Sequence, residues 1–258
     1  MKESDSALFE ISKENEEAAE SADSAHQEGQ EIRPAQSPES VDRPNLFLKI
    51  MSFINFVTGE VEFKIVYYGC ALGGKTSSLG YVHERVDARD RGNLLLLPTQ
   101  NDRTLFFDFL LVDGGVAKGF KVRFKLWTVP GQVMYNATRQ LVLRGVDGIV
   151  FIADSQWDRV EANLESLRNL EENLNTMDLA LDHVPWVIFY NKRDLHDEQI
   201  VPIESLDLFF QTGERKVDRF TGDCVSGTNV FNALNGVTQS VLREFMLRND
   251  LESYEACR

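Results

Sequence analysis

The run Gly69-Cys70-Ala71-Leu72-Gly73-Gly74-Lys75-Thr76 decides the fold of this chain. It fits the pattern G-x-x-x-x-G-K-[ST], and it lies between a hydrophobic β-rich stretch at residues 61–68 and a helical segment at residues 75–84. In this strand–loop–helix context the pattern wraps the phosphates of a nucleotide. Glycines let backbone N–H groups turn inward around phosphate oxygens, and the N-terminus of the helix adds positive potential.

Two polar side chains at the end of this run have separate expected roles. Lys75 should reach the β- and γ-phosphates of a bound nucleotide, and the Thr76 hydroxyl should bind Mg²⁺. A glycine-rich turn that matches by chance is the alternative, and the flanking strand and helix argue against it. The run therefore predicts a P-loop α/β domain.

A second motif, Asn191-Lys192-Arg193-Asp194, follows a predicted buried strand at residues 185–190. A carboxylate at Asp194 can accept hydrogen bonds from the ring N–H and the exocyclic amino group of guanine, a pair of donors that adenine lacks. Lys192 should lay its aliphatic stem along the base, and Asn191 should tie this loop to the phosphate loop. Alone, the tetrapeptide also fits an exposed charged turn, but together the two motifs predict GTP and GDP as ligands.

The stretch Thr128-Val129-Pro130-Gly131-Gln132 follows a predicted strand that ends at Trp127. The Gly131 N–H can bind the γ-phosphate, and Gln132 can orient the attacking water. Thr128 stands where an aspartate associated with Mg²⁺ is usual. Upstream, Thr104 is placed to close on Mg²⁺ and the γ-phosphate.

The rest of the pattern predicts strands alternating with helices. Residues 53–56 and 61–68 indicate a β-hairpin around Thr58-Gly59, and residues 105–111 and 120–127 indicate two strands joined by a turn at Asp113-Gly114-Gly115. Helical spacing of apolar residues marks residues 159–175 and 230–248. We expect a mostly parallel central sheet with helices on both faces and an N-terminal β-hairpin extension, formed by residues 46–250.

Composition limits the possible partners. The chain has 258 residues and a net charge of −14, of which −8 falls in residues 1–45, a segment that we expect to be a disordered acidic tail. We expect a second, short tail at residues 251–258. Acidity argues against nucleic-acid binding. Three scattered cysteines suit a reducing compartment, and with no apolar span or lipidation signal we expect a cytoplasmic chain without a direct membrane anchor.

Four runs together resemble the bacterial MglA family of Ras-like small GTPases, which act in gliding motility and cell polarity. They are Lys64-Ile65-Val66-Tyr67-Tyr68-Gly69, Arg103-Thr104-Leu105-Phe106-Phe107-Asp108-Phe109, Thr128-Val129-Pro130-Gly131-Gln132 and Gly145-Val146-Asp147-Gly148-Ile149-Val150-Phe151-Ile152-Ala153-Asp154-Ser155. The resemblance implies a small GTPase fold and makes a threonine at position 128 normal. It implies that Arg103 is an intrinsic arginine finger and that Gln132 is the catalytic glutamine. It also implies a Roadblock-type activating partner (MglB-like), effectors of the GTP state, and recruitment to a cell pole.

We take Gln132 and Arg103 as candidate catalytic residues, and Thr76 and Thr104 as candidate Mg²⁺ ligands. The candidate nucleotide-binding residues are Gly69, Ala71, Leu72, Gly73, Gly74, Lys75, Thr76, Ser77, Thr104, Gly131, Asn191, Lys192, Asp194, Cys224 and Val225. Two positions depart from the family pattern. The Ala71 methyl replaces a glycine hydrogen near the γ-phosphate, and Cys224-Val225-Ser226 replaces an S-A-K-like run that supports guanine binding.

Three functions stay open at this point. The first is a switch that hydrolyses GTP. The second is a guanine-nucleotide-binding scaffold with little or no hydrolysis, suggested by Ala71 and Thr128. The third is an ATP-dependent P-loop enzyme such as a kinase, which the motif at Asn191 disfavours.

Overall fold

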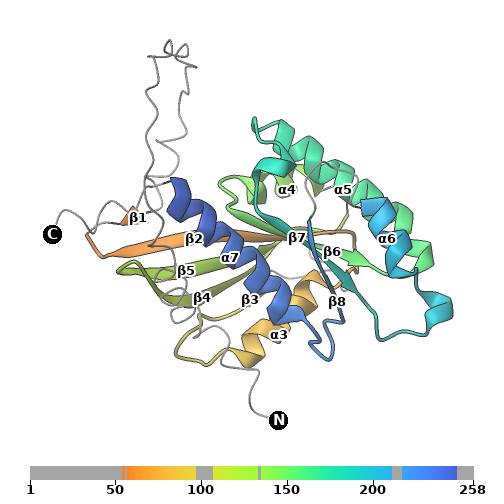
Figure 1. Ribbon diagram of the computed structural model, residues 1–258, viewed down its shortest axis with the longest axis horizontal. Helices are drawn as coiled ribbons and strands as arrows, with labels where there is room; N and C mark the ends of the chain where they lie inside the picture. Colours follow the sequence, from red (N-terminus) through yellow and green to blue (C-terminus); the bar gives the residue numbers. More distant parts are fainter. Residues whose placement is uncertain (1–53, 56, 97–106, 133–134, 211–216, 249–258) are drawn as a thin grey trace, which may run out of the picture.

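The computed structural model describes residues 54–55, 57–96, 107–132, 135–210 and 217–248 (Figure 1). Arg103, Thr104 and both expected tails, at residues 1–45 and 251–258, lie outside the described residues. None of the helices in the described part of the chain is long and apolar enough to cross a membrane.

The strands of the sheet are β1 (Ile54–Asn55), β2 (Glu60–Tyr68), β3 (Leu95–Leu96), β4 (Asp108–Ala117), β5 (Phe120–Thr128), β6 (Gly148–Asp154), β7 (Trp186–Asn191) and β8 (Asp218–Thr221). The α-helices are α3 (Lys75–Arg85), α4 (Asn136–Leu143), α5 (Val160–Asn175), α6 (Ile203–Phe210) and α7 (Val230–Arg248). Short 3₁₀ helices occupy Trp157–Arg159, Leu181–His183 and Asp197–Gln199.

The sheet is mostly parallel, as the sequence predicts. Its strand order is β3-β4-β5-β2-β6-β7-β8, and β1 pairs with β2 beside this path. Strands β5, β2, β6, β7 and β8 run parallel, whereas β4 runs antiparallel to β5 and β3 antiparallel to β4. The expected hairpin at the start of the domain is present, because Asn55 pairs with Glu60 in antiparallel register.

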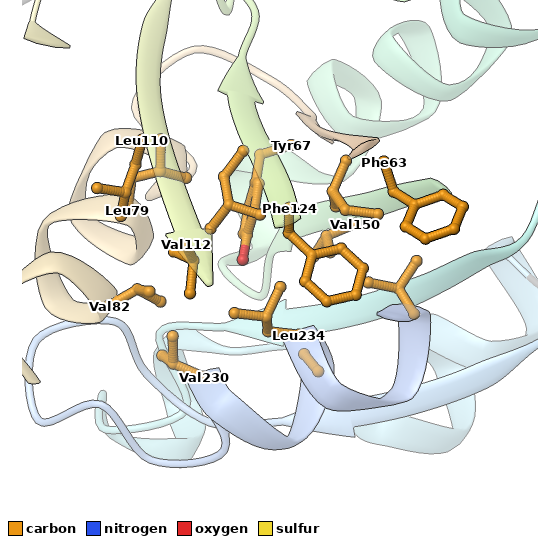
Figure 2. Close-up of a cluster of buried hydrophobic side chains, with 14 of the residues drawn as sticks. Phe63, Tyr67, Leu79, Val82, Leu110, Val112, Phe124, Val150, Val230 and Leu234 are labelled. Carbon is orange, nitrogen blue, oxygen red and sulfur yellow. The ribbon is translucent and has the colours of Figure 1, made fainter. Parts of the chain in front are cut away.

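Helices cover both faces of this sheet (Figure 1). Successive side chains of a strand point to opposite faces, so Ile65 and Tyr67 of β2 pack with α3 and α7, while Val66 and Tyr68 pack with α4 and α5 on the other face. Figure 2 shows the first of these cores, in which Leu79 of α3 and other apolar side chains meet. The two apolar layers fix how the strands align.

The predicted turn at Asp113-Gly114-Gly115 is wrong. These residues belong to β4, where the pairing register shifts between Asp113 and Val116 to form a bulge. The chain reverses instead at Lys118 and Gly119, which both have positive φ, at 48° and 80°. Two consecutive residues with positive φ suit the twist of a tight hairpin, and glycines inside a strand commonly mark a bulge.

The core on the side of α7 gives a test of the fold. Leu234 is buried and Leu247 is exposed on the same helix. Replacing either with alanine makes the same change in intrinsic helix propensity, so the two substitutions differ mainly in burial. Leu234→Ala should lower the free energy of unfolding by about 2–5 kcal/mol, because it removes apolar contacts and leaves a cavity. Leu247→Ala should change it by less than about 0.5 kcal/mol. Urea unfolding at a fixed nucleotide concentration measures both, and equal effects would contradict this packing.

Candidate functional site

The sequence motifs converge at one edge of the sheet. Strands β5, β2, β6 and β7 pair in parallel, so the carboxyl ends of β2, β5 and β7 lie at the same edge of the sheet. The phosphate loop follows β2, the stretch from Thr128 follows β5, and the run from Asn191 follows β7. In open α/β sheets this edge is where ligands bind.

The phosphate loop has a backbone that only its glycines permit. Gly69 and Gly74 have φ values of 143° and 106°. A Cβ atom on Gly69 would lie 2.2 Å from the Ile152 carbonyl oxygen, and one on Gly74 would lie 2.1 Å from the Asn191 amide nitrogen. Leu72 also has positive φ, at 61°, and its side chain is exposed. The loop therefore forms a close-packed cradle that leads into helix α3.

Lys75 is buried at the centre of this cradle. Its Nζ donates to the Gly69 carbonyl at 3.0 Å and to the Cys70 carbonyl at 2.7 Å. Burial lowers the pKa of Lys75 to about 8. A phosphate beside this amine would favour its charged form and raise that pKa again.

A carboxylate that we did not single out lies next to Thr76. Asp108, at the start of β4, is buried, and its Oδ2 accepts from the Thr76 hydroxyl at 2.6 Å and from the Thr128 hydroxyl at 2.9 Å. The Asp108 backbone N–H donates to the same Thr128 oxygen at 2.8 Å. An acidic group therefore accompanies Thr76 although β5 ends in threonine, because the neighbouring strand supplies it.

The segment after β5 packs directly on the phosphate loop. A Cβ atom on Gly131 would lie 2.3 Å from the Ala71 Cα and 2.6 Å from the Ala71 nitrogen. Only glycine allows this approach. Gln132 follows and is half-buried. Gly131, Ala71 and Lys75 thus belong to one local assembly.

Arg159 is a further contact of the phosphate loop that sequence reasoning missed. Its Nη2 donates to the Ala71 carbonyl at 2.6 Å, and its Nε lies 3.7 Å from Asp154 Oδ2. Lys192 Nζ lies 2.6 Å from the same Asp154 oxygen. Asp154 is fully buried and ends β6. Its carboxylate connects the Lys192 loop with the arginine that holds Ala71.

The expected tie by Asn191 is present. Its amide nitrogen donates to the Gly73 carbonyl at 2.7 Å, and its amide oxygen accepts from the Cys224 N–H at 2.9 Å. Cys224 is buried, and burial raises the pKa of its thiol to about 12, with the charge of Asp194 adding to the rise. Asp194 is itself exposed. The phosphate loop, the Asp194 loop and the loop that contains Cys224 therefore meet.

The remaining candidates divide by exposure. Ser77 lies in the first turn of α3 and is exposed, and Val225 is exposed beside Cys224. The Val225 N–H donates to Asp223 Oδ1 at 2.9 Å, so the loop is held by its own aspartate. Arg103 and Thr104 lie in the part of the chain that the structure does not describe.

The residues present suit a phosphate–magnesium ligand. The cradle excludes side chains where phosphates need backbone N–H groups, and the Thr76 hydroxyl beside the Asp108 carboxylate is an oxygen donor set of the kind Mg²⁺ prefers. Among the described residues no group of three or more His, Cys, Asp or Glu side chains could hold a metal. Mg²⁺ bound through phosphates needs few protein ligands, so this finding does not conflict with the site.

Comparison with known proteins identifies the family of the chain. Residues 110–241 match the family model described as the ADP-ribosylation factor family. The chain is 47% identical over 194 residues to the mutual gliding-motility protein MglA of Myxococcus xanthus (strain DK1622), an alignment that spans 75% of this chain and 97% of that protein. The recognised motifs, the sheet order and both matches lead to one assignment: the chain belongs to the MglA-like small GTPases.

Proposed function

We propose that this chain is a switch that binds GTP, hydrolyses it to GDP and controls cell polarity or motility through effectors of the GTP state. The observation that carries the proposal is the double tie of Asn191, at 2.7 Å to Gly73 and 2.9 Å to Cys224, which joins a phosphate loop to a base-reading loop. The working location is the cytoplasm, with recruitment to a cell pole by protein partners.

Base choice rests on Asp194. The carboxylate is exposed and close enough to Cys224 for its charge to raise the pKa of that thiol. It accepts from two donors of guanine, and a site that leaves such a group unpaired rejects the wrong base by about 10⁴-fold or more. Lys192 anchors the loop that carries Asp194, because its ammonium pairs with the buried Asp154 carboxylate. This arrangement favours GTP over ATP as the ligand, and it therefore disfavours an ATP-dependent P-loop enzyme.

Hydrolysis needs an oriented water and positive charge on the transferring phosphoryl group. Gln132 orients the water, and its place after Gly131 puts it next to the phosphate loop. Arg103 supplies the charge from the segment before β4. Lys75 leaves its carbonyl partners for the β- and γ-phosphates, and the Gly131 N–H binds the γ-phosphate.

Thr76, Thr104 and Asp108 would hold Mg²⁺, Asp108 through its contact with the Thr76 hydroxyl. When bound, the ion would offset the negative charge of the phosphates. The acidic role that usually falls to a residue at the end of β5 falls here to Asp108 at the start of β4. Thr128 does not take over the role of the aspartate that is usual at its position. It holds Asp108 in place, because its hydroxyl donates to the Asp108 carboxylate.

A Roadblock-type activating protein, similar to MglB, is the proposed partner. It would accelerate hydrolysis by bringing Arg103 to the transferring phosphoryl group. A second candidate function is a scaffold that hydrolyses GTP poorly. The contact between Gly131 and the Ala71 backbone favours it, because a methyl on Ala71 adds bulk where the attacking water must fit.

The first prediction from this proposal tests hydrolysis itself. Arg103→Ala and Gln132→Ala should retain GDP affinity and lose roughly 10³-fold or more of the partner-stimulated rate, since a finger contributes 10³–10⁵ in GTPases generally. Arg89→Ala, at an exposed surface ion pair with Asp87, serves as the control and should keep the parent rate. Single-turnover GTP hydrolysis with and without the Roadblock partner measures both.

If Arg103→Ala hydrolyses GTP at the parent rate with the partner present, Arg103 is not the arginine finger. A parent chain that stays inactive even with the partner would favour the scaffold. In that case Ala71→Gly decides whether the methyl causes the inactivity, because faster turnover would show that it does.

The second prediction concerns base choice. Asp194→Asn should weaken GDP binding by about 10²-fold or more and improve binding of xanthosine diphosphate, because the amide donates where guanine also donates and xanthine offers a carbonyl. Asp197→Asn, an exposed acidic position nearby in sequence, should leave both affinities unchanged. Equilibrium titration with fluorescent nucleotides measures the two affinities, and unchanged GDP binding in Asp194→Asn would contradict base reading.

The third prediction concerns Mg²⁺. Mg²⁺ slows GDP release, and Asp108→Asn should raise the Mg²⁺ concentration at the midpoint of this effect roughly tenfold. The reason is that a hydrogen bond to a charged group contributes about 1.5–3 kcal/mol. Asp113→Asn on the same strand, paired with Lys121 in the bulge region, is the matched control. Stopped-flow release of fluorescent GDP over a Mg²⁺ series gives the comparison. An identical midpoint in Asp108→Asn and the parent would exclude the role of this carboxylate.

The fourth prediction follows from Lys75, whose pKa lies at about 8 before phosphate binds. Phosphates raise this pKa, so binding takes up a proton once the pH exceeds about 8, and GDP affinity should fall as the pH rises from about 7.5 to about 8.8. The slope should stay below about tenfold per pH unit for one proton. Lys75→Arg, which stays charged, should bind with a flatter profile, and parallel profiles would contradict the assignment.

A further inference from the structure

Arg139 of α4 is the largest fully buried side chain among the described residues. Its guanidinium donates through Nε to the Pro130 carbonyl at 2.9 Å and through Nη2 to the Gly131 carbonyl at 2.7 Å. Nη1 donates to Asn169 Oδ1 at 2.7 Å, and the group stacks 5.1 Å from the ring centre of Tyr68. All of these acceptors are neutral. A buried cation is costly unless its hydrogen bonds are satisfied, so this site is built around the planar fork of arginine.

The two carbonyls that Arg139 binds are consecutive, and this has a geometric consequence. In a planar trans peptide the C=O and the following N–H point in opposite directions. The Pro130 carbonyl shares its peptide with the Gly131 N–H, and the Gly131 carbonyl shares its peptide with the Gln132 N–H. Arg139 therefore turns two successive N–H groups away from itself. Successive N–H groups that point the same way form an anion-binding concavity.

These N–H groups lie beside the phosphate loop. Gly131 touches the Ala71 backbone so closely that a Cβ atom on Gly131 would lie 2.3 Å from the Ala71 Cα. A γ-phosphate bound in this loop would therefore meet the oriented N–H groups.

A buried polar network holds Arg139 itself. Asn169 Oδ1 also accepts from the Tyr68 hydroxyl at 2.7 Å and from Asn173 Nδ2 at 3.1 Å. Asn136 Oδ1, one turn before Arg139 on α4, accepts from Asn169 at 3.0 Å and from Asn173 at 2.8 Å. Strand β2, helix α4 and helix α5 thus fix the arginine from three directions.

We propose that Arg139 is a positioning residue that orients the Gly131 and Gln132 N–H groups for the γ-phosphate, so that it sets the preference for GTP over GDP as well as the rate of hydrolysis. This inference rests on the proposed function for its hydrolysis part only. GDP has no γ-phosphate, so its binding should not depend on Arg139.

The test compares the affinity for GDP with the affinity for a non-hydrolysable GTP analogue. Arg139→Lys keeps the charge, but its three donors lie on a single nitrogen, so it cannot hold the two carbonyls and Asn169 in the positions that the planar fork gives them. It should bind GDP within about twofold of the parent and the analogue roughly tenfold more weakly, since the N–H groups it orients bind a charged ligand. Arg168→Lys, at an exposed ion pair on α5, is the matched control and should leave both affinities unchanged.

The outcomes separate this inference from the proposed function. Equal weakening of both nucleotides by Arg139→Lys would show a merely structural role and overturn the inference, as would parent affinities for both. If Arg139→Lys does not fold, Arg139→Gln is the second variant, because its single amide NH₂ group lacks the fork that holds both carbonyls. A selective loss of the analogue in Arg139→Gln supports the inference, and an unchanged ratio overturns it. If the parent chain binds both nucleotides but does not hydrolyse GTP, the hydrolysis proposal is wrong. The ratio of the affinities for GDP and the analogue still tests the role of Arg139.

Discussion

The side chain of Asn191 is the interaction on which the nucleotide site depends. One amide donates to the phosphate loop at Gly73 and accepts from the loop at Cys224, while its own backbone continues into Lys192-Arg193-Asp194, the run that we propose reads the base. Both atoms are buried, so each bond forms where water cannot compete, and losing either leaves a buried polar group unpaired. Gly74 must be glycine for the same reason, because a Cβ there would strike the Asn191 amide. A single residue thus sets the distance between the phosphate end and the base end.

Three polar side chains around this tie have protein partners where we expect a ligand to bind. Lys75 is held by two backbone carbonyls where phosphate oxygens would take over. The Thr76 hydroxyl donates to Asp108, and Lys192 pairs with the buried carboxylate of Asp154. These contacts keep the site folded around satisfied polar groups. A nucleotide exchanges these contacts for its own, so the free energy cost of keeping the empty site preorganised is small.

The sequence predicts most of this fold because its signals are local. The phosphate loop, the Asn191 run and the apolar periods of α5 and α7 each determine one element, and parallel strands bring their ends together without further information. Contacts between elements distant in sequence were not predictable. Asp108 reaches Thr76 only because β4 pairs beside β5, and Arg159 reaches the phosphate loop from a 3₁₀ turn. The misplaced hairpin turn has a local cause, since Gly114-Gly115 signals a bulge as readily as a turn.

Helix α5 shows why the polar part of the design escaped a pattern based on apolar spacing. Its leucines pack on the sheet, yet the asparagines beside them are also buried and have structural tasks. Asn163 brackets the backbone of Asp154, accepting from its N–H at 3.0 Å and donating to its carbonyl at 2.8 Å. Asn169 holds Arg139 two turns further along. Because a helix of 16 residues is stiff, the carboxylate that pairs with Lys192 and the arginine that binds the Pro130 and Gly131 carbonyls share one rigid frame. A displacement at either end must therefore be absorbed by the loops, and the loops are where a nucleotide-dependent switch needs its freedom.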